Sequence, residues 1–278
     1  MLPILFSLGP VKIYSMGVLM FLGLLLGLYY WWKLGRDEHW DEIALFDAYF
    51  LGFFIFLLVG RLGYVIMHWS DLGTVYRFFA FLAYPGIMYS WGILGSIIGT
   101  IAFVRDKNWD LWKVFDVLVI VLSILILFGS IGAFLNGSNP GKEVSWGVSF
   151  PGSESRYIPV DLWGVIWGVA SFITVARVRK NFRFYSWYKG VASLAKDGLA
   201  TLIFGGLTGV YYLIRAFLDD SLSKLGRFPI MGLIGVGLVI IAAYLIYVRS
   251  GTTIEWDLLQ SKLSLILSKR HKRRGGKL

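Results

Sequence analysis

The chain has 278 residues, of which 57% are hydrophobic and only 16% are charged, and its formal net charge is +10. This composition is too apolar for a water-soluble domain of that length, so the sequence predicts an integral membrane protein. The basic residues fall in short connections and in the tail rather than in one cluster, which argues against nucleic acid as a partner.

Metal and thiol chemistry are also excluded by composition. Cysteine is absent, and the three histidines, His39, His68 and His271, are scattered along the chain. The chain therefore has no disulfide, no thiolate nucleophile and no spacing typical of metal ligands. We expect no metal and no cofactor. The N-terminus lacks a basic segment and a small-residue cleavage site, so we expect the first apolar run to be retained as a membrane span.

Apolar runs long enough to cross about 30 Å of hydrocarbon at about 1.5 Å per residue recur along the chain. The seven runs cover residues 13–32, 44–68, 86–104, 114–134, 162–178, 199–218 and 230–248. The sequence thus predicts an all-α integral membrane protein with seven transmembrane helices in a domain over residues 1–250.

The orientation of these helices follows from the lysines and arginines in alternate connections. The connections on the side of the N-terminus hold six of them, and the opposite set holds nineteen. Positive charge is retained on the cytoplasmic side of a membrane. We therefore expect the N-terminus outside, the C-terminus inside, and a location in the bacterial cytoplasmic membrane.

Two segments outside the spans have amphipathic patterns. Residues 251–278 combine apolar residues at helical spacing with a polybasic end, which predicts a cytoplasmic interfacial helix and tail that anchor on anionic lipid. Residues 71–84 have apolar positions suited to lying flat on the outer surface.

Two arginines lie within spans, at the level expected for the outer leaflet. Arg61 falls in the second run and Arg215 in the sixth. A charge at that depth is costly unless it is paired or faces water. One alternative is that each guanidinium reaches outward to the headgroups. The other is that it binds an anion, for which a lipid phosphate is the obvious candidate.

Glycines break up the fourth run, where the segment from Ser123 to Gly152 passes into a long loop. Clustered glycines either let helices pack closely or bring backbone groups near a ligand. Gly129 and Gly132 by themselves favour close packing, whereas Asn136, Asn139 and the loop favour a site.

Other polar residues lie at the same outer level. They are Tyr89, Ser90, Ser130, Asn136, Asp161, Tyr212 and Asp219. Recognition or chemistry is therefore expected on the outer face. Asp47 and Asp116 lie instead at cytoplasmic helix ends, near an N-terminal turn, where a carboxylate interacts favourably with the helix dipole. We interpret these two as structural.

Five short strings follow one another along most of the chain. They are LFSLGPVKIYSMG at 5–17, VGRLGYV at 59–65, PGIMYSWGILG at 85–95, GSIGAFLNG at 129–137 and WGVSFPGS at 146–153. In this order the chain resembles the bacterial prolipoprotein diacylglyceryl transferases. The resemblance implies seven helices and transfer of diacylglycerol from phosphatidylglycerol to a lipoprotein cysteine.

Several polar positions of that family carry other residues here. Where the family has a histidine in an SFHGG-type motif, this chain has Trp91. In the GRxGNFxNxE motif the arginine, first asparagine and glutamate correspond to Ser130, Ala133 and Ser138, while Asn136 remains. The HPxQLYE-type motif appears as IPVDLWG, which keeps only Pro159 and Leu162. An arginine and a glutamate of the sixth helix correspond to Tyr212 and Ala216.

What remains is Arg61 with Tyr64, and a new pair, Arg215 and Asp219, one turn beyond the family's position. The resemblance implies catalytic roles for Arg61 and Asn136. We add Arg215 and Asp219 as catalytic candidates on the hypothesis that this pair replaces the family's pair; the alternative is that its spacing is a coincidence. It implies lipid or substrate binding by Tyr64, Trp91, Gly92, Ser130, Gly132 and Tyr212. For the proton acceptor the chain offers Asp161, Glu143 and Asp219, and the sequence does not single out one.

Two functions follow from these observations. The first is transfer of diacylglyceryl to a lipoprotein precursor at the outer leaflet, with Arg215 and Asp219 taking over from the missing groups. The second is a catalytically inactive protein on the same fold that binds lipid or lipoprotein. In both, the partners are phosphatidylglycerol or another anionic phospholipid and a lipoprotein precursor peptide.

Overall fold

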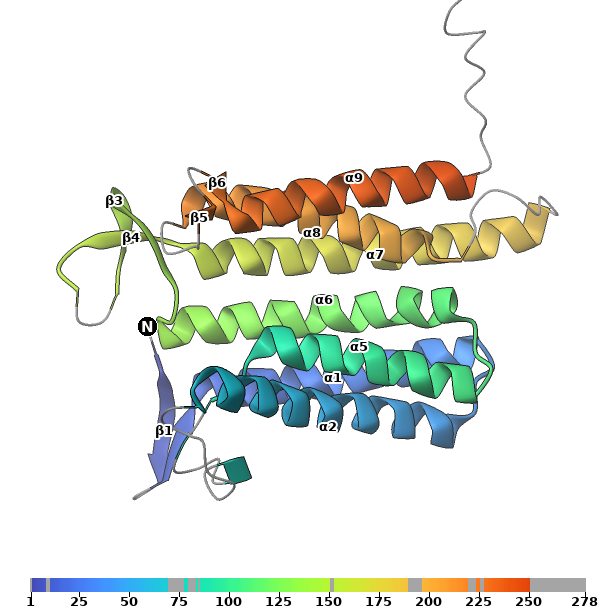
Figure 1. Cartoon of the computed structure of the whole chain (residues 1–278), viewed down its shortest axis with the longest axis horizontal. Helices are drawn as coiled ribbons and strands as arrows, with labels where there is room; N and C mark the ends of the chain where they lie inside the picture. Colours follow the sequence, from blue (N-terminus) through green and yellow to red (C-terminus); the bar gives the residue numbers. More distant parts are fainter. Residues whose placement is uncertain are drawn as a thin grey trace, which may run out of the picture.

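The computed structural model describes residues 2–8, 11–69, 78–79, 84, 86–150, 153–189, 197–219, 224–225 and 228–250. The predicted surface segment at 71–84 and the predicted tail at 251–278 lie almost entirely outside these residues. Within them, long helices run back and forth along one axis (Figure 1).

Each of the seven predicted runs forms a helix. The helices are α1 (Ser15–Asp37), α2 (Glu42–Met67), α5 (Tyr89–Asp106), α6 (Leu111–Asn136), α7 (Val160–Lys189), α8 (Leu199–Leu218) and α9 (Ile230–Ser250). Six of them, all except α5, are long and apolar enough to cross a membrane. The shortest of these, α8 and α9, offer spans of 20 residues, or about 30 Å of helix. A multi-pass membrane protein is thereby confirmed. Helix α5 has 18 residues and includes Tyr89, Ser90, Arg105 and Asp106, so its crossing stays a prediction.

Within the described residues, three two-stranded antiparallel hairpins, which the sequence did not predict, lie at one end of the bundle; one precedes α1 and the other two connect helices. The three hairpins pair β1 (Ile4–Leu8) with β2 (Val11–Tyr14), β3 (Pro140–Ser149) with β4 (Arg156–Pro159), and β5 (Lys224–Leu225) with β6 (Phe228–Pro229). We call this the hairpin end and the opposite end the linker end (Figure 1). The strands are short and irregular in register, so they carry little of the alternating pattern by which a strand is recognised.

Local signals explain where several helices begin and end. At the linker end the Asp41 carboxylate accepts a hydrogen bond from the Ala44 N–H at 2.8 Å, and Asp110 accepts from the N–H groups of Trp112 and Lys113. These carboxylates satisfy N–H groups that have no partner inside the helix. At the hairpin end α6 stops at Gly137, whose φ of 70° is the left-handed conformation that glycine adopts readily.

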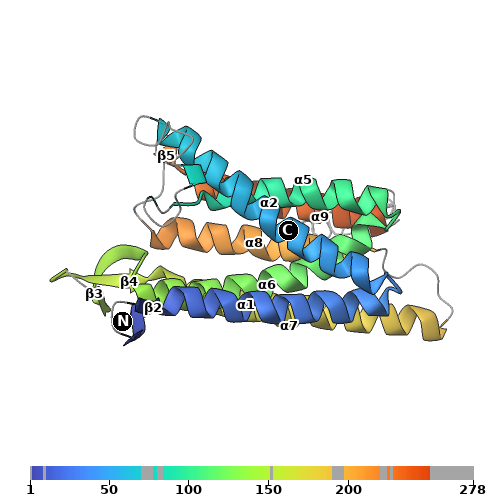
Figure 2. The ribbon, with the colours of Figure 1, turned by 90° about the horizontal axis from the view of Figure 1, so that it is seen from below.

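The helices pack in pairs around α6. Helix α1 lies against α6, α2 against α5, α6 against α7, and α8 against α9. In Figure 1, α2 with α5 and α8 with α9 lie on opposite sides of α6, whereas in Figure 2 both pairs lie on the same side of it. The hairpin-end residues of α2 and α5 and those of α8 and α9 thus belong to separate helix pairs.

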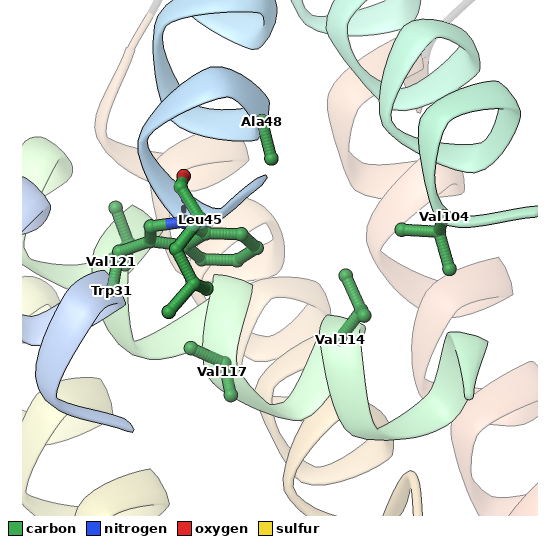
Figure 3. Packing of buried hydrophobic residues seen from close by; sticks show 7 residues of the cluster. All are labelled: Trp31, Leu45, Ala48, Val104, Val114, Val117 and Val121. Atoms are coloured by element: carbon green, nitrogen blue, oxygen red, sulfur yellow. Dashed lines mark hydrogen bonds between the residues drawn. The ribbon is translucent and has the colours of Figure 1, made fainter. Parts of the chain in front are cut away.

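A buried apolar cluster holds four helices together at the linker end (Figure 3). It consists of Trp31, Leu45, Ala48, Val104, Val114, Val117 and Val121. The Trp31 indole N–H donates to the Leu45 carbonyl at 2.8 Å, so the polar group of this large side chain is satisfied. Because α1, α2, α5 and α6 share this core, the linker end forms the rigid base of the bundle.

Asp116 is structural, as predicted, but it stabilises the start of α8 rather than that of its own helix. Helix α6 already begins at Leu111, so Asp116 lies in its second turn. Its carboxylate accepts from the Gly198 N–H at 2.7 Å and from both the N–H and the hydroxyl of Thr201, at 2.8 and 2.6 Å. Asp116 therefore caps α8, whose own N-cap, Gly198, has no side chain to do so.

Candidate functional site

Polar residues gather in two clusters near the hairpin end. The first lies between α2 and α5 and contains Arg61, and the second lies between α7 and α8 and contains Arg215. The sequence predicted one outer-face site, and the structure divides its residues between these two clusters.

Close packing through glycine brings α2 and α5 together at the first cluster. A Cβ added at Gly63 would lie 2.7 Å from the Trp91 Cβ, and one at Gly92 would lie 2.8 Å from the Phe56 carbonyl oxygen. Either distance is far below van der Waals contact, so only glycine allows the two helices to approach this closely. Trp91 and Gly92, which were predicted to bind lipid, here form part of the packing between two helices.

Arg61 is completely buried in the same cluster. Its Nε donates to the Phe78 carbonyl at 3.0 Å, and its Nη1 donates to the carbonyls of Tyr84 and Gly86 at 2.7 and 3.0 Å. The guanidinium also lies over the Tyr64 ring, 5.9 Å from its centroid. Burial rules out the alternative in which Arg61 reaches outward to the headgroups. Arg61 ties α2 to the segment that leads into α5.

The second cluster is built from the ends of α7 and α8 and the segment after α6. Arg215 Nε lies 3.7 Å from Asp219 Oδ2, one turn along α8, and Asp219 is buried. Asp161 Oδ1 accepts a hydrogen bond from the Asn139 amide at 2.9 Å. Asp161, Arg215 and Asp219 are close enough to interact electrostatically. The predicted Arg215–Asp219 pair therefore forms, and Asp161 joins it.

Ser130 of α6 faces the same cluster. A Cβ added at Gly164 of α7 would overlap Ser130 Oγ and would lie 3.3 Å from the Tyr211 hydroxyl. Tyr211 in turn stacks on Trp167, with ring centroids 4.9 Å apart, and interacts with Arg215. Ser130 and the Tyr211 hydroxyl thus both lie next to Gly164, at the contact of α6, α7 and α8.

The remaining predicted residues lie outside these contacts or at their edge. Gly132 faces α1, where an added Cβ would lie 2.6 Å from Met16 Sδ, so this glycine allows close helix packing. Asn136 is exposed and donates to the Ser138 hydroxyl at 2.8 Å. Tyr212 is half-buried with its ring centroid 5.9 Å from that of Tyr211.

Among the residues that the structure describes, no three His, Cys, Asp or Glu side chains come together as metal ligands. Any chemistry in the second cluster must therefore come from its guanidinium, carboxylate and hydroxyl groups. A guanidinium binds phosphate, and a carboxylate accepts protons or hydrogen bonds.

Comparison with known proteins identifies the family to which this arrangement belongs. The family model described as prolipoprotein diacylglyceryl transferase matches residues 3–248. The chain belongs to the prolipoprotein diacylglyceryl transferase family. The match runs from the first hairpin to the end of α9 and includes both clusters.

Several relatives bear the name phosphatidylglycerol–prolipoprotein diacylglyceryl transferase. One from Aeromonas hydrophila is 27% identical over 88% of this chain and 89% of its own length. One from Campylobacter hominis is 26% identical over 81% of each chain. One from Agrobacterium fabrum is 32% identical, and that match spans 54% of this chain and 57% of the relative.

Two of the positions at which this chain differs from the family motifs are neighbours in the structure. Ser130 stands where the family motif has an arginine, and Gly164 is the last position of IPVDLWG, where the HPxQLYE motif has a glutamate. These two residues are in contact. Two positions that are charged in the family motifs thus carry small neighbouring residues here, with the Tyr211 hydroxyl close to Gly164.

Sequence reasoning missed Tyr211, Gly164 and the hydrogen bond between Asn139 and Asp161. Asn139 and Asp161 are 22 positions apart, and the β3–β4 hairpin between them brings them together. The only sequence signals were an acidic residue at the start of a span and a pair of adjacent tyrosines.

Proposed function

We propose that this protein transfers diacylglyceryl from phosphatidylglycerol to the cysteine of a lipoprotein precursor, at the outer leaflet of a bacterial cytoplasmic membrane. The observation that carries the proposal is the family match over residues 3–248. The hairpin end would face outward, because it is the side on which few lysines and arginines fall.

The reaction makes one bond and breaks one. The cysteine sulfur attacks the glycerol carbon of the diacylglycerol unit that carries the phosphate. A thioether forms, the carbon–oxygen bond to phosphate breaks, and glycerol phosphate leaves with the electron pair. The thiol proton passes to an acceptor. The site must therefore hold positive charge at the departing phosphate and a proton acceptor at the sulfur.

Arg215 supplies the positive charge in this proposal. It lies near the hairpin end of α8, with Asp219 Oδ2 3.7 Å from its Nε and Tyr211 close enough to interact with it. Arg61 holds the α2–α5 packing through backbone carbonyls. The proton acceptor remains one of the carboxylates at this end.

A second candidate function is favoured by one specific observation. Trp91, Ser130, Ala133, Ser138, Tyr212 and Ala216 replace polar groups of the family motifs. Groups that act as a unit in a transition state do not compensate one another independently. The second candidate is therefore a non-catalytic protein that binds phosphatidylglycerol or lipoprotein on the same fold.

Purified full-length protein with phosphatidylglycerol and a lipobox peptide separates the two functions. Transfer predicts glycerol phosphate release above a lipid-only background and a matching gain in peptide mass. Arg215→Ala is expected to reduce the rate by about 10²-fold or more, because it removes charge from the departing phosphate. Arg156→Ala, an exposed arginine of β4, is the matched control and should leave the rate unchanged. Absence of release while phosphatidylglycerol still binds would establish the non-catalytic function.

A further inference from the structure

Asp161 has a carboxylate oxygen that is buried and lacks a partner. The residue is 9% exposed, and Oδ1 is bound to the Asn139 amide. Oδ2 has no hydrogen bond within the part of the chain that the structure describes, and it is shielded from solvent. Buried polar atoms are almost always hydrogen-bonded, because leaving one unpaired is costly. An unpaired buried oxygen therefore indicates that something else donates to it.

The same cluster contains a hydrogen-bond donor that is also buried and unpaired. Arg215 Nε is buried and makes no hydrogen bond among the described residues. Its distance of 3.7 Å to Asp219 Oδ2 is too long for one. Asp161 and Arg215 interact electrostatically, yet no hydrogen bond joins these two atoms. The cluster thus contains one buried donor and one buried acceptor that make no hydrogen bond among the described residues.

We propose that this pair recognises the headgroup of a phospholipid that carries hydroxyl groups beyond its phosphate. A phosphate oxygen accepts from Arg215 Nε, and a headgroup hydroxyl donates to Asp161 Oδ2. The identity of the lipid as phosphatidylglycerol rests on the proposed function. Asp161 is then a specificity-determining residue, because it distinguishes a glycerol headgroup from other phosphodiesters.

The surroundings of the pair suit a lipid. On α8, Phe217 is 73% exposed two positions after Arg215, and on α7 Trp163 is 41% exposed two positions after Asp161. These side chains offer apolar surface at the level of the headgroup, where aromatic residues are favoured and acyl chains begin. A free phosphate compound would make no use of that surface.

The test measures equilibrium binding of radiolabelled short-chain phosphatidylglycerol to the purified full-length protein, in competition with unlabelled compounds. Phosphatidylmethanol has the same phosphate and charge but no headgroup hydroxyl. Phosphatidylethanolamine has an ammonium donor instead, and soluble glycerol phosphate has the headgroup without acyl chains. Wild-type protein should bind phosphatidylglycerol about tenfold or more tightly than phosphatidylmethanol, because a hydrogen bond to a charged group is worth about 1.5–3 kcal/mol.

Two variants separate the roles of the pair. Asp161→Asn keeps the shape and an acceptor for Asn139, and it should bring the ratio of the two affinities close to one. Arg215→Gln should weaken binding of both lipids by a similar factor and leave their ratio unchanged. Glu154→Gln, between β3 and β4, and Arg156→Gln on β4 are both exposed; they are the matched controls and should alter neither affinity.

Several results would overturn the inference. They are equal wild-type affinity for phosphatidylglycerol and phosphatidylmethanol, an unchanged ratio in folded Asp161→Asn, and glycerol phosphate as effective as the lipid. The wild-type comparison applies even if a variant fails to fold. Selective binding without glycerol phosphate release would refute the proposed function and leave this inference intact. If the protein transfers diacylglyceryl but Asp161→Asn leaves the ratio of the two lipid affinities unchanged, the proposed function stands and this inference is refuted.

Discussion

At the scale of single residues, Arg61 shows how a buried charge can be held by neutral groups. Its donors meet the carbonyls of Phe78, Tyr84 and Gly86, and the Tyr64 ring lies beside it. Hydrogen bonds from a charged donor are stronger than neutral ones, and a guanidinium can serve several acceptors at once. The segment before α5 is therefore positioned by one side chain of α2.

Replacing Arg61 should destabilise the protein directly. Arg61→Met keeps a long apolar stem but leaves three carbonyls without this donor, and the expected cost is about 2–4 kcal/mol. The measurement is the midpoint of thermal unfolding in detergent. Arg156→Met, at an exposed position of β4, is the matched control and should change stability by no more than about 0.5 kcal/mol. Equal midpoints for the two variants would show that the carbonyl contacts contribute nothing.

At the scale of elements, α8 depends on a residue of another helix. Its N-cap is Gly198, and the hydrogen bonds that a capping side chain normally makes come from Asp116 of α6. This contact fixes the linker end of α8 against α6. The hairpin end of α8 carries Arg215, so the direction of the helix, and with it the position of the guanidinium, depends on Asp116.

Asp116→Ala is therefore expected to loosen α8. Loss of an N-cap costs about 0.5–2 kcal/mol, and here a hydrogen bond from the Thr201 hydroxyl is lost as well. Hydrogen exchange should increase at the first turn of α8, and the unfolding midpoint should fall. Asp47→Ala in α2 is the matched control, because Asp47 is exposed. Greater exchange in both variants, or in neither, would contradict the role of Asp116 as the cap.

The helices themselves could be predicted from sequence, because a span needs only a long apolar run. The 199–218 run coincides with α8, whereas the 162–178 run falls short of α7, which continues through charged residues to Lys189. The hairpins and the cap on α8 could not be predicted. They depend on pairs such as Asn139 with Asp161 and Asp116 with Thr201, which become neighbours only after the helices have packed.

Contacts that form only when the helices pack also limited the prediction of the candidate site. Resemblance placed Arg61, Trp91 and Ser130 in one site, but which helix pair each residue joins is a property of packing. In the structure Arg61 and Trp91 belong to the first cluster, between α2 and α5, and Ser130 belongs to the second cluster, between α7 and α8. The Arg215–Asp219 pair was predictable because its spacing of four residues lies on one helix face.

At the scale of the whole molecule, the two ends of the bundle differ in character. The linker end holds the apolar core around Trp31 and the partly buried ion pair of Arg179 with Glu38 at 2.8 Å. The hairpin end holds the glycine-packed seam and the Arg215 cluster. A rigid base at one end and polar clusters at the other suit a protein that acts on a ligand from one side of the membrane only.

That side can be identified by chemical labelling, and the split of six to nineteen lysines and arginines predicts that the hairpin end faces outward. The chain contains no cysteine, so single cysteines can be placed without background. Glu154→Cys lies beyond β3 at the hairpin end and Asp106→Cys at the linker end of α5, and both positions are exposed. In intact cells an impermeant thiol reagent should label the first and not the second, and both should react after the membrane is opened. Labelling of Asp106→Cys alone would reverse the orientation and place the Arg215 cluster at the inner leaflet, away from secreted lipoprotein precursors. Labelling of both in intact cells would mean that α6, the helix between the two positions, does not cross the membrane.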